Sequence, residues 1–392
     1  MSGPQSLPQG DTGRRRAETR VIRVGINARA LAKPDPAGVS RHTFSLLEAL
    51  AERSTAGVDS DIEYLLFGLD APPDTLAEYD CIRNAGEPAA AHSGLSAHYW
   101  EQFVLPRALG KYDLDVFHTP AGQPPVLADV SEVPLVTTIH DVSPITHPEW
   151  FSRPYAAVYR VLTPLAVRAS DRIVTISRFA RETITDVYPN ATDKITTVYN
   201  GVTPPIEPGT PVEKLRSDRF VLFVGSVNRR KNVRTLIAAY RQYRVRATDP
   251  VRLVLAGPER DMFADLDYQI PDGIETLGYV SDEQLGWLYR NAAAFVFPSL
   301  YEGFGLPIIE AMHAGTPVVA SDRGAMAEVA GDAAELVNPL DAASITEGIE
   351  HLLSSKARKR ELTERGRDRA LSFTWERAAS RTADVYRAVA GR

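Results

Sequence analysis

The sequence predicts an α/β protein made of two Rossmann-like halves, each with a parallel sheet, that face each other across a cleft. Length is the first reason: the chain has 392 residues, and one hydrophobic core rarely grows beyond ~250–300. Pattern is the second: short runs that are apolar throughout alternate with amphipathic stretches, which is typical of a parallel sheet covered by helices. The third is a proline-rich segment at 202–218, after which the same alternation begins again.

The first domain is expected to span 21–202, behind a polar segment at 1–20 that we interpret as a disordered leader. Its strands are expected at 21–27, 62–68, 115–119, 133–141, 171–177 and 194–201. Amphipathic stretches predict helices at 40–52 and 154–169. Pro164 is expected to bend the second of these helices.

A linker at 203–218 is expected to lead into the second domain, 219–373. Its apolar strands are expected at 219–226, 251–257, 293–299 and 316–321, with helices between them. In open parallel sheets, ligands bind beyond the carboxyl ends of the strands. The residues that follow each strand are therefore the candidates for a functional site.

Composition excludes several classes of function. The formal net charge is −6, which does not favour binding to nucleic acid. Cys81 is the single cysteine, so an internal disulfide and a cysteine-based metal cluster are excluded. No apolar run approaches the ~20 residues that span a bilayer, and the expected location is the cytoplasm. GxGxxG after the first strand, GxxxxGK[ST] and HExxH are all absent, and neither "DLD" triplet clearly ends a buried strand, so no nicotinamide cofactor and no metal are expected.

The sharpest signal in the second domain is "FVGSVNRRKNVRTL" at 223–236. A strand ends at Gly225, and a short loop brings Arg230 and Lys231 to the start of a helix, with Asn232 as its N-cap. Cations are unfavourable at a helix N-terminus, whose dipole is already positive, unless an anion also binds there. The pattern therefore predicts a diphosphate site; a solvated basic turn is the alternative. Lys231 is expected to be exposed in the empty cleft.

The stretch "YEGFGLPIIE" at 301–310 places two glutamates around a glycine-rich turn. Pro307 suits the first turn of a helix, and the glycines are expected to leave backbone N–H groups uncovered near its positive end, as an anion cradle. Glu302 and Glu310 can accept hydrogen bonds from hydroxyl groups on either side of a phosphate. A diphosphate between two sugars, as in a nucleotide sugar, fits this order. The alternative, a capped helix with acids matched to its dipole, explains Glu310 but not the glycines.

Two further candidates follow strands of the first domain. Gly38, in "DPAGVSRH", lies between the first strand and its helix, where a glycine lets the backbone approach a phosphate or a sugar; a plain turn is the alternative. His140 and Asp141 end a buried strand, so their side chains are expected in the cleft. There the histidine is expected to donate to a sugar hydroxyl and the aspartate to orient it; a histidine that caps a loop is the alternative.

In their order along the chain, these motifs resemble the retaining glycosyltransferases of the GT-B fold, family 4, which include many mannosyltransferases. The likeness covers nearly the whole chain from about residue 21. The segments that carry it are "GVSRH", "IHDVSP", "RIVTISRFAR", "VYNGV", "FVGSVNRRKN", "LVLAGP", "LGYVSDEQLGWLYRNAAAFVFPSLYEGFGLPIIEAMHAGTPVVAS" and "AEVAGDAA". The resemblance implies that 374–392 is a helix that packs back on the first domain.

The resemblance also implies roles for the candidate residues. The catalytic group would be Arg230 and Lys231 as the diphosphate pair, Glu302 on the transferred hexose and His140 near the reacting sugar. Glu310 would contact the ribose, and the flexible loop at Gly38 would lie near the donor. Phe304, Gly305 and Leu306 would offer backbone N–H groups to the donor. Ser226 and Gly303 would also belong to the donor site. Ser226 stands where many members of the family have arginine. No metal and no cofactor are implied, because the nucleotide sugar is a substrate.

The predicted activity is therefore transfer of a hexose, with mannose from GDP-mannose as the first choice, to a glycan or lipid-linked acceptor. Two other classes stay open at this point: a nucleotide-sugar epimerase of related fold, and a non-catalytic nucleotide-sugar-binding subunit. A basic stripe of Arg153, Arg160 and Arg168 beside several aromatic residues predicts peripheral contact with an anionic membrane, at its inner face; a solvated helix face is the alternative.

Overall fold

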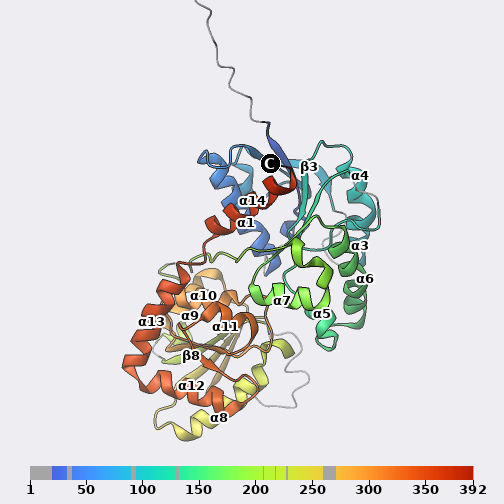
Figure 1. The fold of residues 1–392 in the computed structure, drawn as a ribbon. Helices are drawn as coiled ribbons and strands as arrows, with labels where there is room; N and C mark the ends of the chain where they lie inside the picture. Colours follow the sequence, from blue (N-terminus) through green and yellow to red (C-terminus); the bar gives the residue numbers. More distant parts are fainter. Residues whose placement is uncertain are drawn as a thin grey trace, which may run out of the picture.

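The computed structural model shows two α/β halves, one above the other in Figure 1. It describes residues 20–32, 38–89, 94–128, 132–205, 207–216, 218–226, 228–258 and 271–391. The leader expected at 1–20 lies outside the described residues except for Arg20, whose guanidinium donates to Asp115 Oδ1 over 2.6 Å. In the described part of the chain, no helix is both long enough and apolar enough to cross a membrane.

The first half is built on a seven-stranded parallel sheet in the order β3-β2-β1-β4-β5-β6-β7. Its strands are β1 (Ile22–Asn27), β2 (Ile62–Gly68), β3 (Ile82–Pro88), β4 (Val116–Thr119), β5 (Leu135–Thr138), β6 (Arg172–Thr175) and β7 (Ile195–Thr197). Its α-helices are α1 (Val39–Thr55), α2 (Asp74–Ala77), α3 (Gly94–Tyr99), α4 (Leu105–Leu109), α5 (Ser143–Thr146), α6 (Arg153–Ala169) and α7 (Arg178–Val187). The π-helical turn η2 (Trp100–Val104) and the 3-10 turns η1 (Arg29–Ala32), η3 (Pro148–Trp150) and η4 (Pro189–Lys194) complete it. The helix α6 runs on through Pro164.

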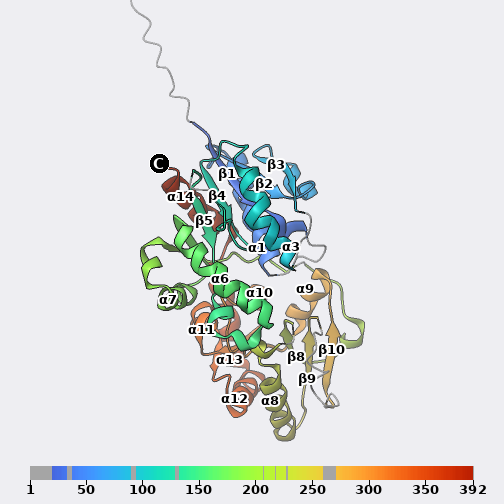
Figure 2. The ribbon, with the colours of Figure 1, turned by 90° about the vertical axis from the view of Figure 1, so that its right-hand side faces the viewer.

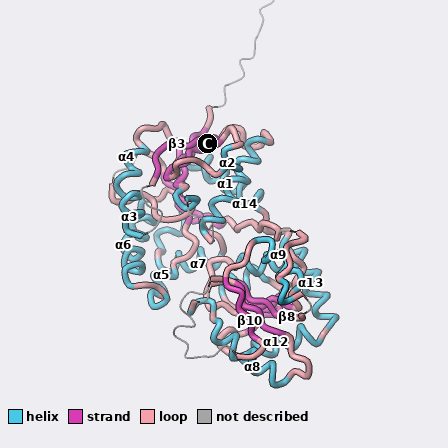
Figure 3. The backbone as a smooth tube through the Cα atoms, turned by 180° about the vertical axis from the view of Figure 1, so that it is seen from behind, coloured by secondary structure: helices cyan, strands magenta, loops and turns pink. Residues whose placement is uncertain are grey.

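The second half is built on a six-stranded parallel sheet in the order β10-β9-β8-β11-β12-β13. Its strands are β8 (Phe220–Val224), β9 (Arg252–Ala256), β10 (Ile274–Gly278), β11 (Ala294–Phe297), β12 (Val318–Ser321) and β13 (Glu335–Val337). Its helices are α8 (Val233–Arg246), α9 (Asp282–Asn291), α10 (Leu306–His313), α11 (Gly324–Ala330), α12 (Ala342–Ser354) and α13 (Lys356–Ala370), with the 3-10 turns η5 (Glu213–Leu215) and η6 (Arg229–Lys231). Helices wrap the strands of both halves (Figures 2 and 3).

The two predicted parallel sheets are confirmed, but three strands were missed. They are β3, β10 and β13, and each lies at the edge of its sheet. An edge strand is partly exposed and carries polar residues, so it lacks the continuous apolar run that marks a buried parallel strand. In β4 and β11, by contrast, every residue is buried.

The last helix, α14 (Trp375–Val389), returns to the first half and lies beside α1 (Figure 1). Its buried side, which includes Ala379 and Tyr386, belongs to the core of that half. The chain therefore crosses between the halves twice, before and after the second sheet. The N–H of Val202 in the first crossing donates to the carbonyl of Phe373 in the second over 3.1 Å, so the two crossing segments are joined.

Tyr386 anchors α14 through a buried polar contact. Its hydroxyl lies 2.7 Å from Nδ1 of His118, whose Nε2 lies 2.8 Å from Thr138 Oγ1. We expect Tyr386→Phe to lower the free energy of unfolding by about 1–3 kcal/mol, because it leaves a buried histidine nitrogen without its partner. Urea unfolding checks this, with Tyr279→Phe as the control at an exposed tyrosine. Equal midpoints for the two variants would contradict the anchoring role.

Candidate active site

The basic loop after β8 is held in place by two asparagines. Asn228 caps η6 by accepting from the N–H of Lys231 over 3.1 Å. Asn232 has φ 58°, a left-handed conformation, and precedes α8. Asn232 is the N-cap residue of α8, as expected, but its side chain makes no capping hydrogen bond. Its amide donates instead to the carbonyls of Pro298 and Pro339 over 3.0 and 2.6 Å. The turn thereby fixes Arg230 and Lys231 against the loop that follows β11.

Lys231 is paired with one of the two glutamates. Its Nζ lies 2.8 Å from Glu302 Oε1, and it also stands over the ring of Phe297 at 4.5 Å. The expectation that Lys231 is exposed is wrong: Lys231 and Glu302 are each only 8% exposed. A buried ammonium needs a counter-charge, and Glu302, in the loop that follows β11, supplies it.

Arg230 joins the two halves. Its guanidinium lies 4.0 Å from Glu302 Oε2 and 3.7 Å from Asp141 Oδ2, which belongs to the first half. Asp141 also accepts from the N–H of Ser143 over 2.8 Å, so its carboxylate is held rigidly. Two cations and two carboxylates thus meet where the carboxyl ends of the two sheets face each other.

The two glutamates differ in electrostatic environment. Burial would raise the pKa of Glu302, but the charges of Lys231 and Arg230 outweigh it, so the pKa is lowered and the carboxylate is ionised at neutral pH. Burial raises the pKa of Glu310 above its ordinary value, although the Tyr289 hydroxyl donates to its Oε2 over 2.8 Å. Glu302 is therefore a carboxylate held by two cations, whereas the pKa of Glu310 lies above the ordinary glutamate value.

The glycine-rich turn touches the first half directly. A Cβ on Gly303 would stand 2.5 Å from the carbonyl oxygen of His140, so only glycine allows this approach. The hydroxyl of Ser177 donates to the Gly303 carbonyl over 2.7 Å. Gly305 has φ 109° and precedes α10. Glycine at 303 is therefore required by close contact between the halves, a reason that the sequence alone did not indicate.

The same turn presents uncovered backbone donors, as expected. Within the described part of the chain, the N–H groups of Gly303, Phe304, Gly305 and Leu306 make no hydrogen bond. The Phe304 side chain is buried against Phe373, with ring centroids 5.5 Å apart. The N-terminus of α10 thus combines unsatisfied donors with the positive end of the helix dipole, beside Lys231.

His140 lies in the cleft, but its hydrogen bonding differs from the expectation. Its Nε2 lies 2.9 Å from the carbonyl oxygen of Pro120, which can only accept. Nε2 therefore carries the proton, and burial lowers the pKa of the imidazole, so the ring is neutral. Its Nδ1 can accept a hydrogen bond from a sugar hydroxyl but cannot donate one. Asp141, expected to orient the ring, instead pairs with Arg230.

The structure keeps two candidate residues apart from the charged cluster. Gly38 has φ 55° and stands exposed at the start of α1, next to the undescribed residues 33–37. Ser226 accepts a hydrogen bond from the Asn228 amide over 3.1 Å. No interaction of either residue with Arg230, Lys231 or Glu302 is present in the described part of the structure.

Sequence reasoning missed several residues that hold the halves together. Arg41 donates to Asp282 across the cleft over 2.6 Å, and Glu328 accepts from the N–H of Phe179 over 2.8 Å. Such pairs join residues more than a hundred positions apart, so neither spacing nor periodicity indicates them.

Two cavities open between the halves. One of about 300 Å³ is lined by His140, Asp141 and Arg230, and by the aromatic residues Phe151, Tyr155 and Tyr159. The other, of about 470 Å³, is lined by Glu310 and Tyr289 with Arg41 and Asp282. The two glutamates therefore belong to different cavities. Glu302 lies 4.0 Å from Arg230, which lines the first cavity. Glu310 lines the second. Among the described residues, no group of three or more His, Cys, Asp or Glu side chains is arranged to hold a metal ion.

Two family models together match most of the chain. Residues 36–204 match the family model described as Glycosyltransferase Family 4, and residues 211–369 match Glycosyl transferases group 1. The O-antigen chain mannosyltransferase B of Escherichia coli is 33% identical over 266 residues, which are 64% of this chain and 70% of that protein.

Solved structures share the fold over almost the whole chain. The sucrose-phosphate synthase of Thermosynechococcus elongatus has a TM-score of 0.70 at 22% identity, covering 94% of this chain and 99% of that one. The Anabaena protein HepE, solved in complex with UDP-glucose, has a TM-score of 0.67 at 19% identity, covering 94% and 100%. At these identities the likeness establishes the two-domain GT-B architecture.

The Lys231–Glu302 pair makes a prediction about stability. We expect Lys231→Met and Glu302→Gln each to lower the free energy of unfolding by about 1–3 kcal/mol, because each leaves a buried charge short of its partner. The double variant should recover much of that loss, which gives a coupling of about 1–3 kcal/mol in a double-mutant cycle. The depressed pKa of Glu302 makes the coupling fully present at neutral pH, and it should fade only as pH falls below the ordinary glutamate value. Additive losses at pH 7 would show that the pair is not coupled.

Proposed function

Since this chain belongs to glycosyltransferase family 4, whose members have the GT-B fold and transfer sugars with retention, we propose that it moves a hexose from a nucleoside-diphosphate sugar to a glycan or lipid-linked acceptor. The single observation that carries the proposal is the pairing of Lys231 and Arg230 with Glu302 beside the uncovered N–H groups of 303–306. The matched families are glycosyltransferases, which sets aside the epimerase and the binding subunit.

The diphosphate of the donor is proposed to lie on the cations of η6 and the N-terminus of α10. Two fixed cations and a set of free N–H groups stabilise the charge that develops on a leaving diphosphate. They supply the charge that a metal ion supplies in other transferases, which agrees with the metal independence of the family. In this proposal Ser226 contributes its backbone, and Gly38 approaches the donor from the other half.

Glu302 has a second role in this proposal. While the cleft is empty, its carboxylate neutralises Lys231 at 2.8 Å. A bound diphosphate would compete for that ammonium, and the Glu302 carboxylate would then be available to accept from hydroxyls of the transferred hexose. The cluster is therefore nearly neutral before binding, which limits the repulsion among its cations.

Glu310 is proposed to accept from the ribose hydroxyls. It lines the cavity of about 470 Å³, away from Arg230 and His140. Tyr289 holds one of its oxygens, so the other oxygen can face the ligand. This order of hexose, diphosphate and ribose follows the order of Glu302, the glycine-rich turn and Glu310 in the chain.

The acceptor is proposed to enter the cavity of about 300 Å³. Phe151, Tyr155 and Tyr159 form a stack there, with successive ring centroids 5.4 and 4.5 Å apart. An apolar wall with a few polar groups is typical of sites for small ligands. Neutral His140 opens on the same cavity, so its Nδ1 can accept from a hydroxyl near the reacting carbon.

Transfer is proposed to proceed by same-face substitution, in which the leaving diphosphate takes the proton of the acceptor hydroxyl. The alternative route needs a carboxylate that attacks the sugar. With donor bound, Glu302 is proposed to accept from the hydroxyls of the hexose, and Asp141 accepts from the N–H of Ser143. Neither is placed as a free nucleophile.

Mannose from GDP-mannose is the donor we propose. The family resemblance and the mannosyltransferase from Escherichia coli support it, whereas UDP-glucose in the Anabaena structure marks the runner-up.

We also propose that the exposed side chains of Arg153, Arg160 and Arg168 on α6 bring the enzyme to an anionic membrane. Equal co-sedimentation with neutral and anionic vesicles at low salt would contradict that proposal.

The activity is tested by incubating the protein with GDP-mannose, UDP-glucose, dTDP-glucose and ADP-glucose, with EDTA present and with glycan acceptors. We expect transfer with retention from one donor, and slow hydrolysis of that donor without acceptor. Lys231→Ala should reduce kcat by about 10²–10³, the usual cost of one preorganised donor to a developing charge. The same kcat within a few-fold would overturn the diphosphate assignment.

The two glutamates should differ in their kinetic effects. Glu302→Gln is expected to depress kcat most, because it touches the sugar that changes charge in the transition state. Glu310→Gln is expected to raise KM for the donor with little change in kcat, since its contact is equal in ground and transition states. Steady-state kinetics on the two matched variants distinguish the roles, and the reverse pattern would exchange them.

The raised pKa of Glu310 gives the affinity for the donor a pH dependence. Glu310 accepts from the ribose only as a carboxylate, so KM should rise as pH falls through a pKa above the ordinary glutamate value. Glu302 has a lowered pKa and should not titrate in that window. A KM profile that is identical in wild type and Glu310→Gln would contradict this assignment.

A further inference from the structure

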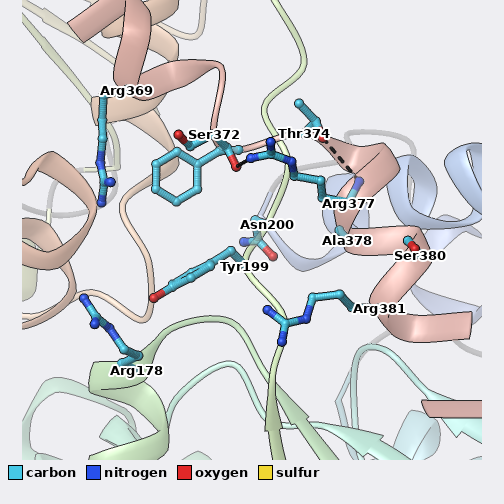
Figure 4. A pocket seen from close by; sticks show the side chains of 11 residues that line it. Arg178, Tyr199, Asn200, Arg369, Ser372, Thr374, Arg377, Ala378, Ser380 and Arg381 are labelled. Carbon is cyan, nitrogen blue, oxygen red and sulfur yellow. Dashed lines mark hydrogen bonds between the residues drawn. The ribbon is translucent and has the colours of Figure 1, made fainter. Parts of the chain in front are cut away.

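A third cavity lies at the point where the two halves are joined, and it does not belong to the donor cleft. It has a volume of about 450 Å³, and its lining comes from α7, from both crossing segments, from the end of α13 and from the start of α14. Four arginines line it: Arg178, Arg369, Arg377 and Arg381. Figure 4 shows their side chains around Tyr199.

The charge in this cavity is poorly balanced. No carboxylate is among the residues that line it. Glu328, outside the lining, forms an ion pair with Arg178 at 3.3 Å and accepts a hydrogen bond from the Tyr199 hydroxyl. Arg369 donates only to backbone carbonyls, those of Glu328 and Val329. It has no ion pair among the described residues.

The two arginines of α14 that line this cavity have no carboxylate partner among the described residues. Arg377 donates to the Ser372 carbonyl over 3.1 Å and has no carboxylate partner in the described structure. Arg381 is exposed and makes neither a hydrogen bond nor an ion pair with any described residue. Four guanidinium groups around one cavity repel one another unless a bound anion balances their charge. The paired N–H donors of a guanidinium group match the spacing of two phosphate oxygens.

We infer that this cavity binds a phosphate monoester of about the size of a sugar phosphate. The arginines would hold the phosphate. The remaining lining can contact the organic part of the ligand, which would be about the size of a sugar. It includes the aromatic rings of Tyr199 and Phe373 and the polar side chains of Asn200 and Ser380. Inorganic phosphate alone is far smaller than the cavity.

The position of the cavity makes such a ligand a bridge between the halves. Arg369 comes from the second half, and Arg178, Arg377 and Arg381 come from helices of the first half. Val202 and Phe373, which are hydrogen-bonded to each other, lie in the two crossing segments beside this cavity. A bound phosphate therefore ties together the two bodies whose relative position defines the donor cleft.

One wall of the cavity also reaches the catalytic cluster. The Asn200 Oδ1 lies 2.9 Å from Nδ1 of His42, and the His42 ring stands edge-on to His140 with centroids 4.7 Å apart. Only one side chain therefore separates the cavity lining from the histidine of the cleft. The binding inference itself does not depend on the activity proposed above.

Titration calorimetry with glucose 6-phosphate and with inorganic phosphate tests the inference. We expect saturable binding of glucose 6-phosphate, and Arg377→Gln/Arg381→Gln should weaken its Kd at least about tenfold, through the loss of two charge-assisted contacts. The matched control is Arg216→Gln/Arg360→Gln, which removes two exposed arginines paired only with neighbours on their own turns. Thermal unfolding of each variant verifies that it is folded.

Arg230→Gln separates this cavity from the diphosphate site, because it changes the donor cleft alone. Glucose 6-phosphate should bind it as it binds wild type. The inference would be overturned if wild type bound no glucose 6-phosphate at 10 mM and was not captured by phosphatidic acid vesicles. Binding of glucose 6-phosphate that Arg230→Gln abolishes and Arg377→Gln/Arg381→Gln preserves would also overturn it.

The same phosphate chemistry occurs in a lipid headgroup, and vesicles distinguish that source. Vesicles of phosphatidylcholine, with and without phosphatidic acid, are sedimented with wild type and with Arg377→Gln/Arg381→Gln. Binding of glucose 6-phosphate without vesicle capture identifies a free phosphate monoester. Capture by phosphatidic acid that the double variant loses and the control keeps identifies the headgroup as the source, and either result supports the site.

Discussion

The close contact between Gly303 and the carbonyl of His140 is the constraint on which the site depends. Because a side chain at 303 would stand 2.5 Å from that oxygen, the glycine brings the loop after β11 directly against the loop after β5. Ser177 fixes the same loop by donating to the Gly303 carbonyl. With the two loops in contact, Glu302 reaches Lys231 from one side and Asp141 reaches Arg230 from the other.

Because of this contact, charged side chains from the two halves lie close enough to form ion pairs across the cleft. The carboxyl ends of parallel strands gather loop residues at one edge of each sheet, but each edge alone holds only half of the charges. Arg230 and Lys231 belong to the second half, and their carboxylate partners come from both halves. Ion pairs therefore bridge the cleft, and in the proposed function the diphosphate competes with Glu302 for Lys231.

The sequence predicted the interior of the fold better than its borders. Every predicted strand is present, since strands such as β8 and β11 are apolar on both faces. The edge strands β3, β10 and β13 were missed because solvent covers part of each, and their sequences mix polar with apolar residues. A pattern that depends on burial reports only the strands that are buried.

The site was predictable as a set of residues but not as a set of contacts. The positions of Glu302, Arg230 and Lys231 after strand ends were enough to bring them together. The burial of Lys231 depends on a carboxylate 71 positions away, from 231 to 302. The tautomer of His140 depends on the Pro120 carbonyl, and the role of Gly303 depends on a neighbour in the other half. Residue types reveal the chemistry that is available, whereas tertiary contacts decide which proton or charge each group keeps.

Calorimetric binding of nucleoside diphosphates in EDTA tests the central claim most directly, because it measures the diphosphate site without any turnover. Wild type, Lys231→Ala and Arg230→Gln are titrated with GDP, UDP, ADP and dTDP. The account predicts that wild type binds at least one of these without metal, and that each substitution weakens its Kd by about tenfold or more, as expected for the loss of a charge-assisted contact. Unchanged affinity in both variants would contradict the account and place the diphosphate elsewhere.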